Sequence, residues 1–157
     1  MNSFEQSVVE FGSRANNLLR TLGLPAPNKP SKEVVFPEDL GSIHSDDLGI
    51  HLSYWASMCA YGHQKVAVLE GALVLAREQA EAEYDVRLFA KPSSQKITER
   101  RAHVSATKAV RSLRSRVATI EADLKVLKSV LLGYDLKNAA ISREITRRQQ
   151  ERLLRDG

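Results

Sequence analysis

The chain has little of what stabilises secreted proteins and nothing typical of membrane proteins. Its 157 residues include one cysteine, Cys59. A single cysteine excludes an intramolecular disulfide framework and is typical of a reducing compartment. No apolar run is long enough to cross a bilayer, and the N-terminus is acidic and amphipathic rather than a basic leader before an apolar segment. We therefore expect a cytoplasmic protein that makes no membrane contact.

Residues that favour strands and turns are also scarce. Aromatic residues make up 6% of the chain and glycine occurs eight times, whereas 43% of residues are hydrophobic and 27% are charged. The apolar content is too high for a disordered protein, and the abundance of Ala, Leu, Glu, Arg and Lys favours helices. The composition therefore predicts an all-α protein with the length of one domain.

Patterns typical of enzymes and metal sites are lacking as well. The sequence contains no nucleophile elbow, phosphate-binding glycine loop or dinucleotide fingerprint. Cys59 and His63 have i, i+4 spacing, but no second ligand pair accompanies them and Cys59 lies in an apolar stripe. The four carboxylates within residues 78–85 have no partner histidine nearby, which favours a solvated acidic face. We predict no enzyme activity, no metal site and no cofactor.

The chain divides by pattern into three segments. In residues 1–23, apolar residues recur at three- and four-residue spacing and end at Gly23, which predicts a short amphipathic helix. Residues 24–45 hold four of the five prolines and predict an extended connector or arm. Its apolar stretch at 34–36 is suited to docking on a neighbouring surface. Residues 46–157 form the remaining domain.

That domain carries two apolar stripes whose steps alternate between four and three residues, the a/d pattern of a coiled coil. The first begins at Ser45 or Asp46 and stops before Pro92. The second follows a short polar loop, with Ser93 or Ser94 as its cap. The seam residues that we expect to pack are Trp55, Val66, Leu69, Leu73, Val110, Leu113, Val117, Ile120, Leu124, Leu127 and Leu131.

Each stripe predicts a helix of about 45 to 55 residues, which is about 67 to 80 Å long. Because only a short loop joins the two helices, they must fold back as an antiparallel hairpin. Gly133 lies off the second stripe and marks either a bend or a break. A hairpin buries one stripe per helix, which is little for a monomer. We therefore expect a homo-oligomer, or a hairpin covered by the N-terminal helix.

Charge is distributed unevenly along the chain. Residues 1–95 carry 8 Lys/Arg and 12 Asp/Glu, a net charge of −4, whereas residues 96–157 carry 15 and 7, a net charge of +8. Residues 100–120 contain six basic residues and no acidic one, although exposed helix faces ordinarily pair opposite charges at i, i+4. These six are the predicted nucleic-acid-binding residues: Arg100, Arg101, Lys108, Arg111, Arg114 and Arg116.

Five of the six are arginines, which bind phosphate with two parallel hydrogen bonds. No aromatic residue interrupts them, so the predicted contacts are to backbone phosphates, with little sequence readout and strong salt dependence. Two alternatives remain open. The six residues are a solvated face without a partner, or they meet the acidic first half of a neighbouring subunit.

The order of these features resembles that of a known family. The segments "LSYWASMCAYGHQKVAVLEGALVLAREQAEAEYD" and "HVSATKAVRSLRSRVATIEADLKVLKSVLLGYDLKNAAISREI" resemble the phage recombination mediators of the UvsY type over residues 46–148. In that family a basic cluster lies near the end of the first long helix. This chain has the acidic "REQAEAEYD" there, so that role cannot be transferred, and residues 1–45 have no counterpart.

The resemblance implies a homo-oligomeric protein of the host cytoplasm that binds single-stranded DNA without sequence specificity. It also implies that the protein helps to load a RecA-type recombinase onto strands covered by single-strand-binding protein. The alternative is a structural helical-hairpin protein, for example of a phage virion, that uses its apolar seams and N-terminal arm for protein–protein contacts.

Overall fold

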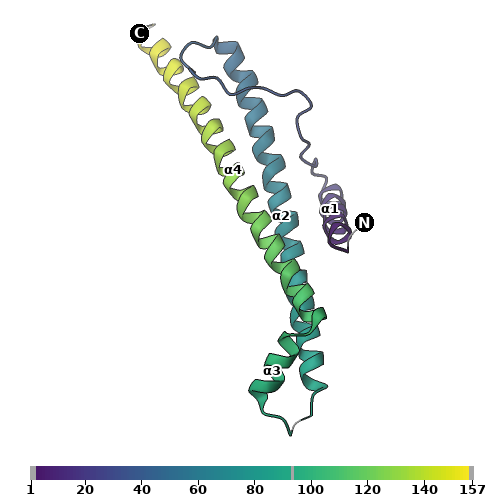
Figure 1. Ribbon diagram of the computed structural model, residues 1–157. Coiled ribbons are helices and arrows are strands. Elements are labelled where there is room, and N and C mark those ends of the chain that lie inside the picture. The colour runs from purple at the N-terminus through teal and green to yellow at the C-terminus, as the bar shows by residue number, and fades with distance from the viewer. Residues whose placement is uncertain (1–2, 93, 156–157) are drawn as a thin grey trace. The chain divides into compact units, whose positions relative to one another are not determined.

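The computed structural model describes residues 3–92 and 94–155, with the side chains of residues 3–8, 10 and 11 left aside. Most of these residues are helical. Figure 1 shows the helices of the described residues, which are α1 (Ser3–Thr21), α2 (Ser45–Phe89), α3 (Ile97–Ser105) and α4 (Lys108–Arg155). The two long helices, α2 and α4, pair as an antiparallel hairpin. The predicted all-α hairpin fold is therefore confirmed. Within the described ranges, no helix combines the length and the apolar character of a membrane span.

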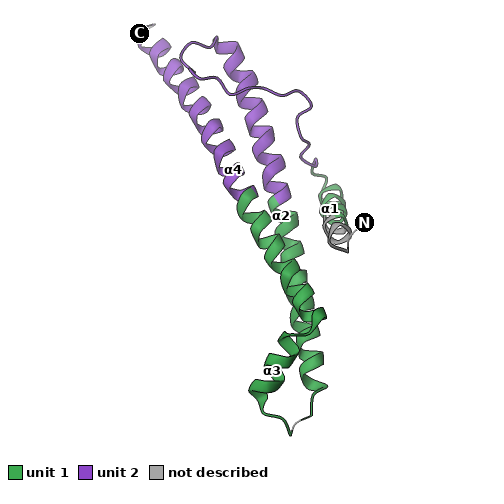
Figure 2. Ribbon diagram, in the orientation of Figure 1, with its two compact units in different colours: residues 1–24, 66–126 green, residues 25–65, 127–157 purple. Residues whose placement is uncertain are grey.

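The chain divides into two compact units, which Figure 2 colours separately. Unit 1 consists of Met1–Leu24 and Val66–Val126, and unit 2 of Pro25–Lys65 and Leu127–Gly157. Each unit contains a stretch of α2 and a stretch of α4, so both long helices run from one unit into the other.

Unit 2 has an aromatic core around Trp55, which is 5% exposed. Its ring centroid lies 5.1 Å from Tyr54, 5.9 Å from Phe36 and 5.5 Å from Tyr134 on α4. Trp55 therefore packs in the interior, as its place on the seam predicts. Phe36 docks the connector on its own unit, whereas the neighbouring Val35 is 81% exposed.

The seam residues lie at the contact between the long helices. Gly62, on the first stripe, leaves a gap that Leu131 of α4 fills, because a Cβ built on Gly62 would stand 2.8 Å from Leu131 Cδ1. Of α2, Val68 and Ala72 are also buried although they lie off the stripe, so this helix buries a wider face than predicted. The predicted seam residues are buried at Trp55, Val66, Val110, Ile120, Leu124 and Leu131, and half-buried at Leu69, Leu73, Leu113, Val117 and Leu127.

The prediction of one continuous second helix was wrong, because residues 106 and 107 separate α3 from α4. The hydroxyl of Thr107 donates to the carbonyl of Val104 at 2.7 Å, and the Thr107 N–H donates to the same carbonyl at 3.1 Å. Thr107 then accepts the N–H of Arg111 at 3.0 Å, which begins α4. The side chain of Thr107 thus provides a hydrogen-bond donor for a carbonyl at the end of α3, and its backbone carbonyl accepts the first hydrogen bond of α4.

The other predicted boundaries differ less. Gly133 lies inside α4 and interrupts nothing. Lys96, rather than a serine, is the N-cap residue of α3, and it makes no side-chain capping bond. The alternative cap Ser93 lies outside the described residues. Gly23 ends α1 as predicted, with a positive φ of 67°.

Candidate nucleic-acid interface

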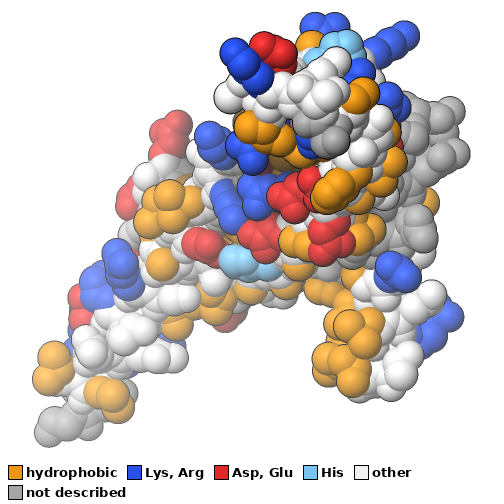
Figure 3. All heavy atoms as spheres, turned by 90° about the horizontal axis from the view of Figure 1, so that it is seen from below, with side chains coloured by type: hydrophobic (Ala, Val, Ile, Leu, Met, Phe, Trp, Pro, Cys, Tyr) orange, Lys and Arg blue, Asp and Glu red, His pale blue; other side chains and the backbone are white. Residues whose placement is uncertain are grey.

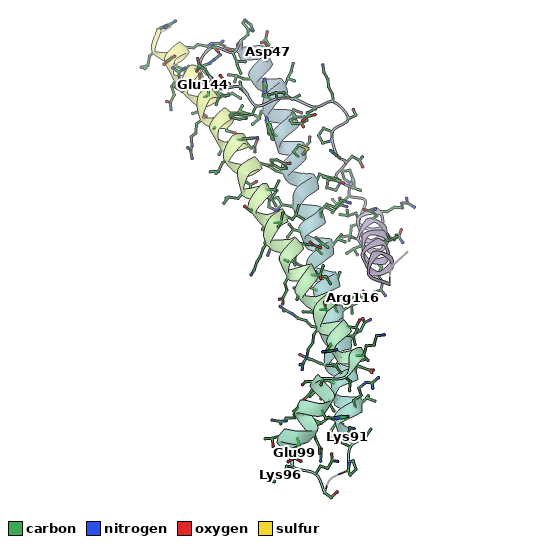
Figure 4. All side chains as sticks on the ribbon, in the orientation of Figure 1. Asp47, Lys91, Lys96, Glu99, Arg116 and Glu144 are labelled. Atoms are coloured by element: carbon green, nitrogen blue, oxygen red, sulfur yellow. The ribbon has the colours of Figure 1, made fainter. Side chains whose placement is uncertain are left out.

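The six predicted DNA-binding residues are divided between two helices of unit 1. Arg100 and Arg101 lie on α3, and the other four lie on α4 beyond the break at residues 106 and 107. Figure 4 shows Arg116 on α4, and Glu99 at the start of α3. The uninterrupted basic stretch of the sequence is therefore not one continuous helical face.

Three of the six residues form one row along α4, which we call the basic row: Lys108, Arg111 and Arg114. They follow one another at i, i+3 spacing, so each is about 60° around the helix and about 4.5 Å along it from the next. All three are exposed. Within the described part of the chain, the side chains of Lys108 and Arg111 form no hydrogen bond or ion pair.

The other three residues do not join the basic row. Arg116 lies about 160° around α4 from Arg114, on the opposite flank of the seam, and is half-buried. Arg100 is half-buried, and its Nε has no hydrogen-bond partner among the described residues. Arg101 is exposed on α3. The structure thus brings together three of the predicted residues and separates the rest.

An aromatic ring lies beside the basic row, which the sequence analysis missed. The guanidinium carbon of Arg114 lies 5.3 Å from the centroid of the Tyr84 ring on α2. The two residues are 30 positions apart, so no local pattern connects them. Only the predicted antiparallel hairpin could have indicated this contact, because it places the end of the first stripe opposite the start of the second.

Tyr84 and Arg114 line a groove of about 500 Å³ in unit 1, which we call the Tyr84 groove. One of its walls contains an ion pair between the helices, with Arg77 Nη2 of α2 at 2.5 Å from Glu121 Oε1 of α4. The remaining lining residues are Ala80, Glu81, Asp85, Val117 and Ala118. The groove therefore combines an aromatic ring, two guanidinium groups and three carboxylates.

Two of the four carboxylates within residues 78–85 thus lie beside Arg114, at one end of the basic row. Glu83 pairs within its own helix with Arg87, at 2.5 Å, whereas Glu81 and Asp85 face the groove and are exposed. Figure 3 shows Lys and Arg side chains beside Asp and Glu side chains rather than a uniformly basic surface. A polyanion would be attracted by the basic row and repelled by the carboxylates beside it.

In unit 2, three basic residues near the end of α4, Arg147, Arg148 and Arg152, already form hydrogen bonds within the unit. Arg148 donates to the carbonyl of Ile43 at 2.6 Å, of Leu40 at 2.9 Å and of Gly41 at 3.0 Å, a set of hydrogen bonds that we call the Arg148 clasp. Its Nε donates to Glu144 at 2.7 Å. Hydrogen bonds from Arg147 and then from Arg148 lower the pKa of Glu144 to about 2. The guanidinium groups of Arg147 and Arg148 are therefore already hydrogen-bonded within the fold.

The pair Cys59 and His63 approaches one carboxylate, that of Asp135. His63 Nε2 lies 3.7 Å from Asp135 Oδ1. Burial, followed by a hydrogen bond to Asp135, raises the pKa of the Cys59 thiol to about 11, so the thiol stays protonated and unreactive near neutral pH. Among the residues that the structure describes, no three His, Cys, Asp or Glu side chains are placed to hold a metal ion.

Comparisons with known protein families, with curated proteins and with solved structures find no match to this chain.

Proposed function

We propose that this chain is a non-enzymatic accessory protein that binds single-stranded DNA through its phosphate backbone. The observation that carries the proposal is the basic row, three exposed cations of which two have no partner among the described residues. Arginine and lysine are the side chains that hold phosphate, and neutralised phosphates release counterions on binding.

The position of the basic row favours an anionic partner over a merely solvated face. Lys108 begins α4, whose first turn contains no acidic residue. The N-terminus of a helix carries a partial positive charge, so a cation there is unfavourable by about 0.3 to 1 kcal/mol. The like charges of neighbouring residues in the basic row add a few tenths of a kcal/mol of repulsion. An anion bound at the basic row reverses both effects.

The role in recombination rests on the UvsY-type resemblance of residues 46–148 alone. It adds to DNA binding the loading of a RecA-type recombinase, contacts with single-strand-binding protein, and homo-oligomerisation. The basic row lies inside the resembling region, but at the start of the second long helix rather than at the end of the first.

A salt titration of binding to a labelled single-stranded oligonucleotide tests DNA binding. The variant Lys108→Glu/Arg111→Glu/Arg114→Glu is expected to bind far more weakly than the wild type. A second variant, in which the same three residues are changed to Gln, removes the three phosphate contacts without adding negative charge. It is expected to lower the slope of log affinity against log salt by about 2, since each phosphate contact on a single strand contributes about 0.7.

A matched control changes the net charge equally at other sites. In Arg20→Glu/Lys29→Glu/Lys32→Glu the replaced cations lie on α1 and on the connector, outside the basic row. This control is expected to keep most of the affinity. Undetectable binding at low salt, or equal losses in the two triple variants, would contradict the proposal.

A second candidate function, a structural assembly protein, is favoured by apolar side chains that the long helices leave exposed. Phe89 of α2 is 83% exposed, and Leu132 and Leu136 of α4 are 61% and 62% exposed. Burying such side chains in an assembly is favourable by about 1.5 to 3 kcal/mol each. This function requires a stable assembly and no affinity for DNA.

A further inference from the structure

We propose that the Tyr84 groove accepts one unpaired nucleobase of a strand whose phosphates lie on the basic row. This inference rests on the proposed function and adds to it a site that reads bases. Arg114 belongs to both features, because it is the last residue of the basic row and also lines the groove against the Tyr84 ring.

The groove has the dimensions and the surface that a planar base requires. Its volume of about 500 Å³ lies within the range of about 300 to 1,000 Å³ typical of small-ligand sites. The half-buried Tyr84 presents an aromatic ring, and Ala80, Val117 and Ala118 provide apolar walls. Stacking of a base on an aromatic side chain is a main source of affinity for single strands.

The charges of the groove favour a base over a phosphate. Glu81, Asp85 and Glu121 place three carboxylates in it, which repel a phosphate and outnumber the guanidinium groups of Arg77 and Arg114. A base is neutral, and its amino groups are donors that carboxylates accept. Glu121 is held by Arg77, whereas Glu81 and Asp85 have no hydrogen bond or ion pair within the described residues.

The groove therefore supplies what the basic row lacks, a reason to prefer single strands. Phosphate contacts alone do not distinguish a single strand from a duplex by its bases. In a duplex the faces of a base are stacked and its Watson–Crick edge is paired, so neither is free to enter the groove. A base entering the groove must be unpaired.

The carboxylates also predict a preference between the two pyrimidine bases of DNA. Cytosine carries an amino donor where thymine carries a carbonyl oxygen, and the two bases are otherwise similar in size. An oligonucleotide of deoxycytidine is therefore expected to bind more tightly than one of thymidine of equal length. Both are expected to bind more tightly than a duplex of that length.

Anisotropy titrations of the full chain with these three probes test the site. Tyr84→Ala is expected to weaken binding to both single strands about five-fold or more, and Tyr84→Phe to retain it, because stacking contributes about 1 kcal/mol or more per base. Glu81→Gln/Asp85→Asn is expected to abolish the preference for cytosine. The same variant binds both strands more tightly, because it removes two negative charges near the phosphates.

A second readout does not depend on a variant's folding. A fluorescent adenine analogue placed in the single strand is expected to be quenched when the wild-type chain binds, through stacking on Tyr84. Binding without quenching, or equal affinities for cytosine, thymine and duplex probes, would overturn the base site while the basic row still binds DNA. Absence of all binding at low salt would instead contradict the proposed function.

Discussion

At the scale of single residues, folding lowers the pKa of the Glu144 carboxyl well below its ordinary value. It accepts hydrogen bonds from Arg147 at 2.6 Å and 2.8 Å and from Arg148 at 2.7 Å, and Arg147 also pairs with Glu151. These bonds lower the pKa of Glu144 from its ordinary value of 4.5 to about 2. The ionised carboxylate therefore stabilises the folded state.

A lowered pKa in the folded state makes stability depend on acid. The contribution of Glu144 is fully present above pH 4.5 and is lost as the pH falls toward 2. The wild-type melting temperature is therefore expected to fall over this interval more steeply than that of Glu144→Gln, which has no carboxylate to protonate. Thermal melts followed by circular dichroism measure both profiles. Parallel profiles from pH 5 to pH 2 would contradict the assignment.

At the scale of helices, two of the glycines inside the long helices, Gly62 and Gly133, have opposite surroundings. Gly62 of α2 faces Leu131 so closely that a Cβ would stand 2.8 Å from Cδ1, whereas a Cβ on Gly133 of α4 would meet nothing within 4 Å. Each glycine weakens its helix by about 1 kcal/mol relative to alanine. At Gly62 the helix gain is opposed by overpacking, which costs about 1 to 3 kcal/mol.

The two alanine variants therefore form a matched pair. Gly133→Ala is expected to raise the free energy of unfolding by up to about 1 kcal/mol. Gly62→Ala is expected to unfold more easily than Gly133→Ala by about 1 to 3 kcal/mol. Urea denaturation in dilute solution measures both. Equal changes in the two variants would show that Leu131 moves aside without cost.

The helices themselves were largely predictable, and their interruption was not. The alternating apolar steps predict α2 and most of α4, because a helix pair must bury its stripes whatever else the chain does. The sequence predicts a bend or a break at Gly133, yet α4 continues through this residue. The break occurs at Thr107, whose hydroxyl donates a hydrogen bond to the carbonyl of Val104 at the end of α3. Such local bonds leave no periodic trace in a sequence.

The candidate site was predictable only in part. The surplus of positive charge in residues 100–120 is visible in the sequence, but its division between α3 and α4 follows from the break at Thr107. Tyr84 and the carboxylates beside it come from the other long helix, so their contact with Arg114 depends on the register of the hairpin. Register is set by side-chain packing along the whole seam.

At the scale of the whole molecule, oligomerisation remains a prediction. Leu132 and Leu136 lie one turn apart on α4 and are both more than half exposed. Light scattering over a range of concentrations is expected to show an assembly that Leu132→Asp/Leu136→Asp dissociates. The control Leu153→Asp/Leu154→Asp places the same charges on exposed leucines in the last turn of α4, and is expected to leave the assembly intact. A wild-type chain that stays monomeric at high concentration would contradict the prediction.

The Arg148 clasp sets a limit on when this protein can finish folding. Its hydrogen bonds join residues that are 105 to 108 positions apart in the chain. During synthesis the connector is made long before its partner, so it must wait as a loose segment until the later part of α4 has emerged. Contacts between such distant residues form slowly, because a long loop must close first. The connector is thus synthesised well before the later part of α4 but becomes ordered only after it.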